Sequence, residues 1–146
     1  GARVYIDFAH SPDALEKLLN TFRQETSSKI VVVFGAGGER DKEKRKNMGL
    51  IAHNLADKIY VTDDNPRNED PASIRREIIE YCPNAEEVSD RAVAIYKAIE
   101  KSGLGDTVLI TGKGHEKSQI VGDQNFPFDD YEQASIAIES IRKLKG

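Results

Sequence analysis

Two short runs of almost continuous apolar, β-branched sequence constrain the fold more than any other feature of this chain. Residues 29–34 read KIVVVF and residues 107–111 read TVLIT. Unbroken runs of this length are typical of strands that are buried on both faces, as in parallel sheets covered by helices on each side. Parallel strands also need long crossover connections, which are usually helices. The two runs therefore predict an α/β fold.

Segments with helical periodicity lie between these runs. Ser11 and Pro12 are a typical helix start, because serine caps free backbone amides and proline is tolerated at the first helical position. Further helices are expected around residues 48–55, from residue 71 and from residue 91. A last helix is expected over about residues 130–143, and its apolar face is predicted to contain Ala134, Ile138 and Ile141.

The remaining β-type segments complete a regular alternation of strands and helices. Strands are expected at residues 4–8, 59–62 and, as a short edge strand, 87–89, with a hairpin-like segment over 120–128 that turns at Gly122. This order predicts a doubly wound, mostly parallel sheet of about six strands with helices on both faces and right-handed crossovers. The 146 residues are expected to form one domain.

Composition excludes several classes of protein. The net charge of −4 and the pI near 5.4 argue against a nucleic-acid or anionic-membrane partner. No apolar run approaches the roughly 20 residues of a membrane span. The lone Cys82 rules out an internal disulfide and suggests a reducing, cytoplasmic environment. Because no methionine or signal peptide precedes the first strand-like segment, we expect a domain excised from a longer protein.

Four polar clusters each follow a predicted strand. They occupy residues 7–11, 35–45, 63–67 and 112–116. In open α/β sheets, ligands bind beyond the carboxyl ends of the strands, where the connecting loops gather at one edge. We therefore expect the four clusters to surround a common site.

The last two clusters together suggest a site for an amino acid. Pro66 stiffens the turn DNPR at residues 64–67, so that Arg67 is held ready for a bidentate bond to a carboxylate. In the loop GKGHE at residues 112–116, glycines let the backbone and the Lys113 ammonium approach an anion, and Glu116 can accept from an ammonium. The alternative is that DNPR is ordinary turn chemistry and that the charges of both loops are solvated.

The first two clusters are also open to two interpretations. The loop GAGG at residues 35–38 can cradle a phosphate or carboxylate, but it matches neither a dinucleotide fingerprint nor a P-loop and could be a plain tight turn. Arg40 either pairs with Asp41 or faces a ligand. Asp7 and His10 have the chemistry to bind ribose hydroxyls, phosphate or a water on Mg²⁺, although His10 could equally be a hydrogen-bond donor at the helix entry.

Read together and in order, the four clusters resemble the C-terminal domain of the Mur ligases. DFAHSPDAL at residues 7–15 is similar to the family run D-Y-A-H-[TN]-P-D-[AS]-L, and GAGGERD at 35–41 to G-[CAS]-G-G-[DEN]-R-D. DNPR at 64–67 and GKGHE at 112–116 match motifs of the MurE-type members, which add meso-diaminopimelate to a cell-wall precursor. The resemblance extends from about Val4 to Leu144.

This resemblance implies a Rossmann-like fold and an ATP-dependent ligase of the bacterial cytoplasm. In the family, ATP with Mg²⁺ converts the carboxylate of UDP-N-acetylmuramoyl-L-alanyl-D-glutamate into an acyl phosphate, which the amine of the incoming amino acid attacks. Arg67 would then bind the distal carboxylate of diaminopimelate and Glu116 its distal ammonium. The residues implied to bind diaminopimelate are Arg40, Asp64, Asn65, Pro66, Arg67, Gly112 and Glu116; those on the ATP side are Asp7, Phe8 and His10; and Lys113 and His115 are possible supporting residues.

The chain also departs from the family pattern. Phe8 replaces the usual tyrosine and lacks its hydroxyl, Ser11 replaces threonine or asparagine, and Ala36 stands where cysteine is common. The P-loop, the carbamylated lysine and the UDP-sugar-binding domain of the family lie outside these residues, so we expect no catalytic residue and no turnover in this fragment alone. Three alternatives remain: a lysine-adding Mur ligase, a domain similar to folylpolyglutamate synthetase, and a non-catalytic nucleotide- or anion-binding module.

Overall fold

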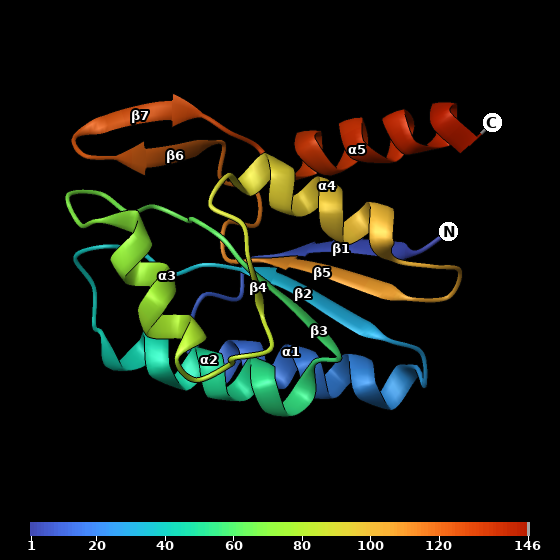
Figure 1. Ribbon diagram of the computed structural model, residues 1–146, viewed down its shortest axis with the longest axis horizontal. Helices are drawn as coiled ribbons and strands as arrows, with labels where there is room; N and C mark the ends of the chain where they lie inside the picture. Colours follow the sequence, from blue (N-terminus) through green and yellow to red (C-terminus); the bar gives the residue numbers. More distant parts are fainter. Residues whose placement is uncertain (146) are drawn as a thin grey trace.

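A sheet of five parallel strands forms the centre of the computed structural model, which describes residues 1–145 (Figure 1). This confirms the predicted α/β, Rossmann-like class, with five strands in the main sheet and the remaining two in a separate hairpin. In spatial order the strands are β1 (Arg3–Asp7), β5 (Thr107–Thr111), β2 (Ile30–Phe34), β3 (Lys58–Val61) and β4 (Glu86–Glu87).

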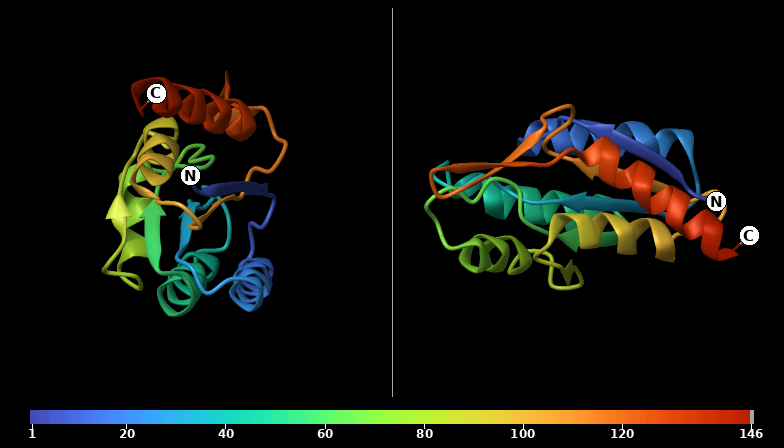
Figure 2. Two further views of the ribbon diagram at one scale, coloured as in Figure 1. Left: turned by 90° about the vertical axis from the view of Figure 1, so that its right-hand side faces the viewer. Right: turned by 90° about the horizontal axis from the view of Figure 1, so that it is seen from above.

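Helices cover both faces of this sheet, as Figure 2 shows in the view along the strands. On one face lie α1 (Pro12–Glu25), α2 (Glu43–Leu55) and α3 (Pro71–Ile79); on the other lie α4 (Arg91–Lys101) and α5 (Asp130–Lys145). The predicted cap of α1 is present, since the Ser11 hydroxyl accepts a hydrogen bond from the Ala14 amide at 3.3 Å. None of the described helices is long and apolar enough to span a bilayer.

Strand β2 shows why its sequence is continuously apolar. All five of its residues are buried, but successive side chains point to opposite faces. Ile30, Val32 and Phe34 pack into the core beneath α1, α2 and α3. Val31 and Val33 pack into the second core, beneath α4 and α5. The chain therefore builds two apolar layers from one strand sequence, and each layer fixes helices that carry the loops of the site.

Helix α5 corrects one detail of the predicted core. Ala134 and Ala137 are buried and Ile141 is half-buried, whereas Ile138 is 36% exposed. Assigning Ile138 to the apolar face was wrong. The helix packs closely on α4, and a close helix–helix contact favours small side chains such as alanine over the bulkier isoleucine one position further round the helix.

The hairpin β6 (Ser118–Val121) and β7 (Gln124–Pro127) forms a separate antiparallel sheet. Its turn contains Gly122 with a φ of +63°, as the sequence predicted. In Figure 1 it lies beyond the sheet, at the end opposite the two termini. Two backbone–backbone hydrogen bonds tie it to the DNPR turn, among others: Arg67 N donates to Ile120 O at 3.1 Å, and Gly122 N donates to Arg67 O at 2.6 Å. The hairpin thus braces the backbone of Arg67.

Candidate functional site

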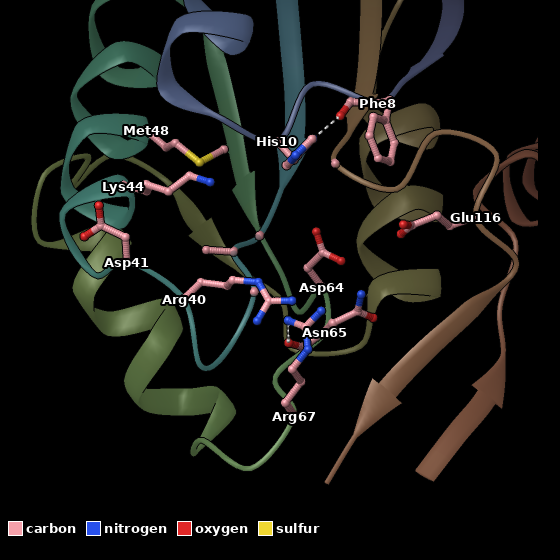
Figure 3. A pocket seen from close by; sticks show the side chains of 14 residues that line it. Phe8, His10, Arg40, Asp41, Lys44, Met48, Asp64, Asn65, Arg67 and Glu116 are labelled. Carbon is pink, nitrogen blue, oxygen red and sulfur yellow. Dashed lines mark hydrogen bonds between the residues drawn. The ribbon is translucent and has the colours of Figure 1, made fainter. Parts of the chain in front are cut away.

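A cavity of about 270 Å³ opens at the carboxyl edge of the sheet, as expected from the position of the polar clusters. All four clusters contribute to its wall, and Figure 3 shows their side chains converging. Its lining residues are Phe8, His10, Gly35, Ala36, Gly37, Arg40, Asp41, Lys44, Met48, Asp64, Asn65, Arg67, Gly112 and Glu116.

Six of the seven residues implied to bind the amino acid line this cavity, and Pro66 does not. Pro66 is buried behind the loop, where its carbonyl lies so close to Gly38 that a Cβ atom on Gly38 would collide with it. Gly38 N also donates to Asn65 O at 2.7 Å. Pro66 therefore shapes the loop by packing against the glycine run, which explains why GAGG is needed there.

The positive side of the cavity is built around Gly37. An ideal Cβ atom there would lie 2.9 Å from Arg67 Nη1 and 3.5 Å from Arg40 Cγ, so both arginines flank this glycine. Arg67 Nη1 donates to Gly38 O at 3.0 Å, which holds one edge of the guanidinium in place. Arg67 Nε and Nη2 donate no hydrogen bond within residues 1–145. Arg40 makes no ion pair with Asp41; its Nη1 donates to Glu39 O at 3.1 Å.

Glu116 approaches the same cavity from another side, and Figure 3 shows its carboxylate directed toward the arginines across the opening. The side chain is exposed and has no ion-pair partner in the described part of the chain. A cationic fork and a carboxylate therefore share one cavity. That arrangement can bind a ligand with both a carboxylate and an ammonium group.

Lys113 lies beneath the cavity and does not line it. Its side chain is fully buried, and its ammonium lies 3.0 Å from Asp64 Oδ1, 2.7 Å from Asn65 Oδ1 and 3.1 Å from Ser118 O. The expectation that this ammonium approaches an anionic ligand is therefore wrong, because a buried ammonium requires protein acceptors and has found them. Its placement fits a supporting residue.

Gly112 is required by both its conformation and its neighbour. Its φ of +116° is a region that side chains rarely adopt, and a Cβ atom would lie 2.8 Å from Asp64 Oδ2. The GKGHE loop can therefore pass over Asp64 only with glycine at this position.

The residues assigned to the ATP side adjoin this cavity. Asp7 Oδ1 accepts from Ala9 N at 2.8 Å, and His10 Nδ1 donates to Phe8 O at 2.9 Å. His10 thus makes the helix-entry hydrogen bond and also lines the amino-acid cavity together with Phe8. Phe8 faces a second cavity of about 510 Å³ as well, whose wall includes Asp7, His115, Lys117, Asp129 and Tyr131.

Two buried arginines that were not predicted from the sequence hold the loops together. The first, Arg45, is 1% exposed. Its guanidinium donates to Gly37 O at 3.1 Å, to Glu69 at 2.8 and 3.0 Å, and to Glu77 at 2.8 Å. The hydrogen bond from Arg45, followed by one from the Glu39 amide, lowers the pKa of Glu69 to about 2. Arg45 therefore fixes the glycine loop to the segment that follows DNPR.

The second, Arg91, forms a fully buried ion pair with Asp130 at 2.8 Å. Its Nη2 donates to Thr111 O at 3.0 Å and its Nη1 to Asp63 O at 3.3 Å, so it links the ends of β5 and β3 to the start of α5. Burial opposes the charge, but the bonds to Asp130 outweigh it and raise the pKa of Arg91. The sequence did contain a sign that both arginines are buried. Each lies on the apolar face of its helix, three residues before Met48 and Ala94 respectively.

Comparison with known protein sequences shows the family of this chain. A family model described as "Mur ligase, glutamate ligase domain" matches residues 1–114. The UDP-N-acetylmuramoyl-L-alanyl-D-glutamate–2,6-diaminopimelate ligase of Agrobacterium fabrum is 49% identical over 99% of this chain, and that of Zymomonas mobilis is 51% identical over 94%. The chain spans only 30% and 29% of the length of these two relatives.

Solved structures show the same fold. A UDP-N-acetylmuramoyl-L-alanyl-D-glutamate–2,6-diaminopimelate ligase superimposes with a TM-score of 0.90 at 36% identity, over 95% of this chain and 29% of its own. A folylpolyglutamate synthase/dihydrofolate synthase of Yersinia pestis, described as complexed with AMPPNP and Mn, gives 0.62 at 17% identity, over 94% and 28%. This second likeness concerns the fold alone. The chain belongs to the family of Mur ligase glutamate ligase domains, as its four motifs predicted.

Proposed function

We propose that this chain is the amino-acid-binding domain of a cytoplasmic, ATP-dependent ligase that joins meso-diaminopimelate to UDP-N-acetylmuramoyl-L-alanyl-D-glutamate. The observation that carries the proposal is the shared cavity of Arg67 and Glu116, which combines a positive fork with a carboxylate. The names of relatives that are about 50% identical support the same substrates.

The distal head group of diaminopimelate matches this cavity in charge. Its carboxylate would be bound by Arg67, whose planar fork suits a carboxylate better than a lysine would. Its ammonium would be bound by Glu116. Lysine carries its distal ammonium on the corresponding carbon but lacks the distal carboxylate, so binding it would leave the Arg67 guanidinium unpaired. Arg67 therefore favours diaminopimelate over the lysine-adding alternative.

We place ATP next to this cavity, on the far side of Phe8. The second cavity offers the aromatic rings of Phe8 and Tyr131 together with the cation of Lys117, and such groups fit the base and phosphates of a nucleotide. ATP would supply the phosphoryl group that activates the substrate carboxylate. Within residues 1–145 no three His, Cys, Asp or Glu side chains cluster as metal ligands, so the donors for Mg²⁺ are proposed to lie mainly outside this chain.

The test uses the full-length protein that carries this chain, with ATP, Mg²⁺ and the UDP-muramoyl dipeptide. Product is detected by mass spectrometry, with either meso-diaminopimelate or L-lysine as the amine. Truncating one partner of a guanidinium–carboxylate pair costs about 2–5 kcal/mol, so Arg67→Ala should weaken the use of diaminopimelate roughly 30- to 5,000-fold. The control Arg142→Ala removes an arginine that is 73% exposed on α5 and should retain activity.

Two results would contradict the proposal. One is equal incorporation of lysine and diaminopimelate by the unmodified protein. The other is an Arg67→Ala protein that uses diaminopimelate as efficiently as the Arg142→Ala control.

A further inference from the structure

The buried ammonium of Lys113 has no hydrogen-bond donor left for a ligand. An ammonium has three N–H donors, and here three acceptors surround it: Asp64 Oδ1, Asn65 Oδ1 and Ser118 O. Burying a cation is costly unless it is paired in this way. Yet Lys113 lies between two glycines in a loop whose Gly112 and Glu116 line the cavity, where a buried charge requires a reason.

Asn65 supplies that reason, because the two ends of its carboxamide have different surroundings. Its Oδ1 accepts from Lys113 Nζ at 2.7 Å and from Ile120 N at 2.9 Å, which uses both lone pairs of the oxygen. Its Nδ2 makes no hydrogen bond within the described chain. Figure 3 shows this nitrogen on the Asp64 side, toward the cavity, and the oxygen turned toward the hairpin.

The opposite orientation of the Asn65 carboxamide is unfavourable for two reasons. Rotating it by half a turn would place the Nδ2 hydrogens against the Lys113 ammonium and the Ile120 amide, so that donors would face donors. It would also leave the buried ammonium short of one acceptor, which is expensive. Lys113 therefore selects one orientation of the Asn65 carboxamide, although Lys113 itself does not line the cavity.

We propose that Lys113 is a specificity-determining positioning residue, which fixes Asn65 so that a hydrogen-bond donor faces the carboxylate of the bound amino acid. The inference rests on the proposed function. Asn65 Nδ2 then adds a neutral donor to Arg40 and Arg67 on the positive wall of the cavity, which Lys44 also lines. An acceptor at Asn65 would repel the carboxylate, so the cavity selects for that group partly through a lysine that never touches it.

The first test needs no ligand and no substitution. The chain is labelled uniformly with ¹⁵N, and the side-chain amide of Asn65 is observed by NMR. In the fixed orientation Oδ1 accepts from the Ile120 amide, so the Nδ2 protons should give one pair of resonances without a strong NOE to the Ile120 amide proton. Exposed Asn125 on β7 is the internal reference for an unrestrained side chain. A strong NOE between Asn65 Nδ2 and the Ile120 amide, or doubled Asn65 resonances, in the unmodified chain would overturn the proposal.

The second test is a double-mutant cycle on the affinity of the full-length protein for meso-diaminopimelate, measured by calorimetry. Asn65→Ala and Lys113→Met should each weaken binding by about 10- to 100-fold, the size expected for a hydrogen bond to a charged group. If Lys113 acts through Asn65, the double variant should bind at least about fivefold more tightly than the product of the two losses predicts. Losses that multiply independently would overturn the proposal.

The two tests separate this inference from the proposed function. If the protein does not bind diaminopimelate, the proposed function fails, and the NMR experiment still decides whether Lys113 fixes Asn65. In that case Lys113→Met should broaden or double the Asn65 resonances and leave those of Asn125 unchanged. If Lys113→Met does not fold, the spectrum of the unmodified chain remains a test, because a flipped or mixed Asn65 carboxamide there would overturn the proposal.

Discussion

Individual side chains at this site either face the cavity or hold those that do. Arg67 and Glu116 face it with free hydrogen-bonding groups, whereas Arg45 and Glu69 lie behind it in an ion pair at 2.8 Å. Arg67 also has a φ of +52°, a strained conformation for a residue with a side chain. The hairpin bonds and the Arg45 network hold that conformation in place before any ligand binds, which lowers the cost of binding.

The pKa of Glu69 leads to a prediction on acid stability. Because the pKa falls from 4.5 to about 2 on folding, the ionised carboxylate stabilises the folded state at any pH above about 4.5. That contribution is lost as the pH falls toward 2. Glu69→Gln should therefore flatten the decline of melting temperature between pH 4.5 and 2, as measured by circular dichroism. Glu139→Gln, an exposed change on α5, should keep the original profile; the prediction fails if both variants behave alike.

Sequence patterns predicted the residues that face the cavity better than the buried residues that hold them in place. Arg67 and Glu116 lie in tight turns after strands, so their position follows from the chain alone. Arg45 and Arg91 bond to acids that are 24 and 39 residues away, and only the packing of separate helices reveals those partners. The same reason explains Lys113, whose burial depends on a loop, a turn and a hairpin meeting in space.

At the scale of elements, the site is formed by loops that follow the strands and pack tightly against one another. Strand alternation predicted which loops would meet, because parallel strands all end at one edge. It did not predict how closely they pass. The glycine loop after β2 packs against the carbonyls of Thr62 and Pro66, which belong to the loop after β3. The hairpin β6–β7 then clamps that second loop from outside.

This close approach predicts a large effect of one methyl group. In Gly38→Ala the added Cβ would collide with the Pro66 carbonyl, and the shift of backbone needed to relieve it should cost about 1–3 kcal/mol. At roughly 2–4 °C per kcal/mol for a domain of this size, the loss is visible in a thermal melt. Gly103→Ala is the control, since its nearest atom is 3.7 Å away. Equal melting temperatures for the two variants would show that Gly38 does not pack closely against the Pro66 carbonyl.

The buried pair of Arg91 and Asp130 predicts a second, non-additive effect. Removing one partner leaves the other charge buried and should cost about 3–5 kcal/mol in urea denaturation. Replacing both with apolar residues removes both desolvation penalties, so Arg91→Met/Asp130→Leu should be more stable than either single variant. A double variant that loses the sum of the two single losses would show that the pair does not act as a unit.

At the scale of the whole molecule, the chain has two cores and side-chain caps at the starts of α1, α3 and α4. It spans about 30% of the length of its relatives. A ligand bound in the cavity would therefore have to meet its reaction partner at a surface supplied from elsewhere in the full-length protein, and closure between domains is the usual means.

The isolated chain should accordingly fold without catalysing. We expect one cooperative unfolding transition in urea, because both cores share the strands of one sheet. We also expect no amide product from the purified 146-residue chain with ATP, Mg²⁺ and both substrates. Product formed by this chain alone would show that its own residues complete the active site.

The most direct measurement of the central claim is a calorimetric titration of the full-length protein with meso-diaminopimelate and, separately, with L-lysine. The two amino acids differ only in the distal carboxylate, the group assigned to Arg67 and the donor of Asn65. We predict that lysine binds at least 30-fold more weakly, in line with about 2 kcal/mol or more for the lost charge pair. Equal affinities would mean that the positive wall of the cavity does not recognise a carboxylate.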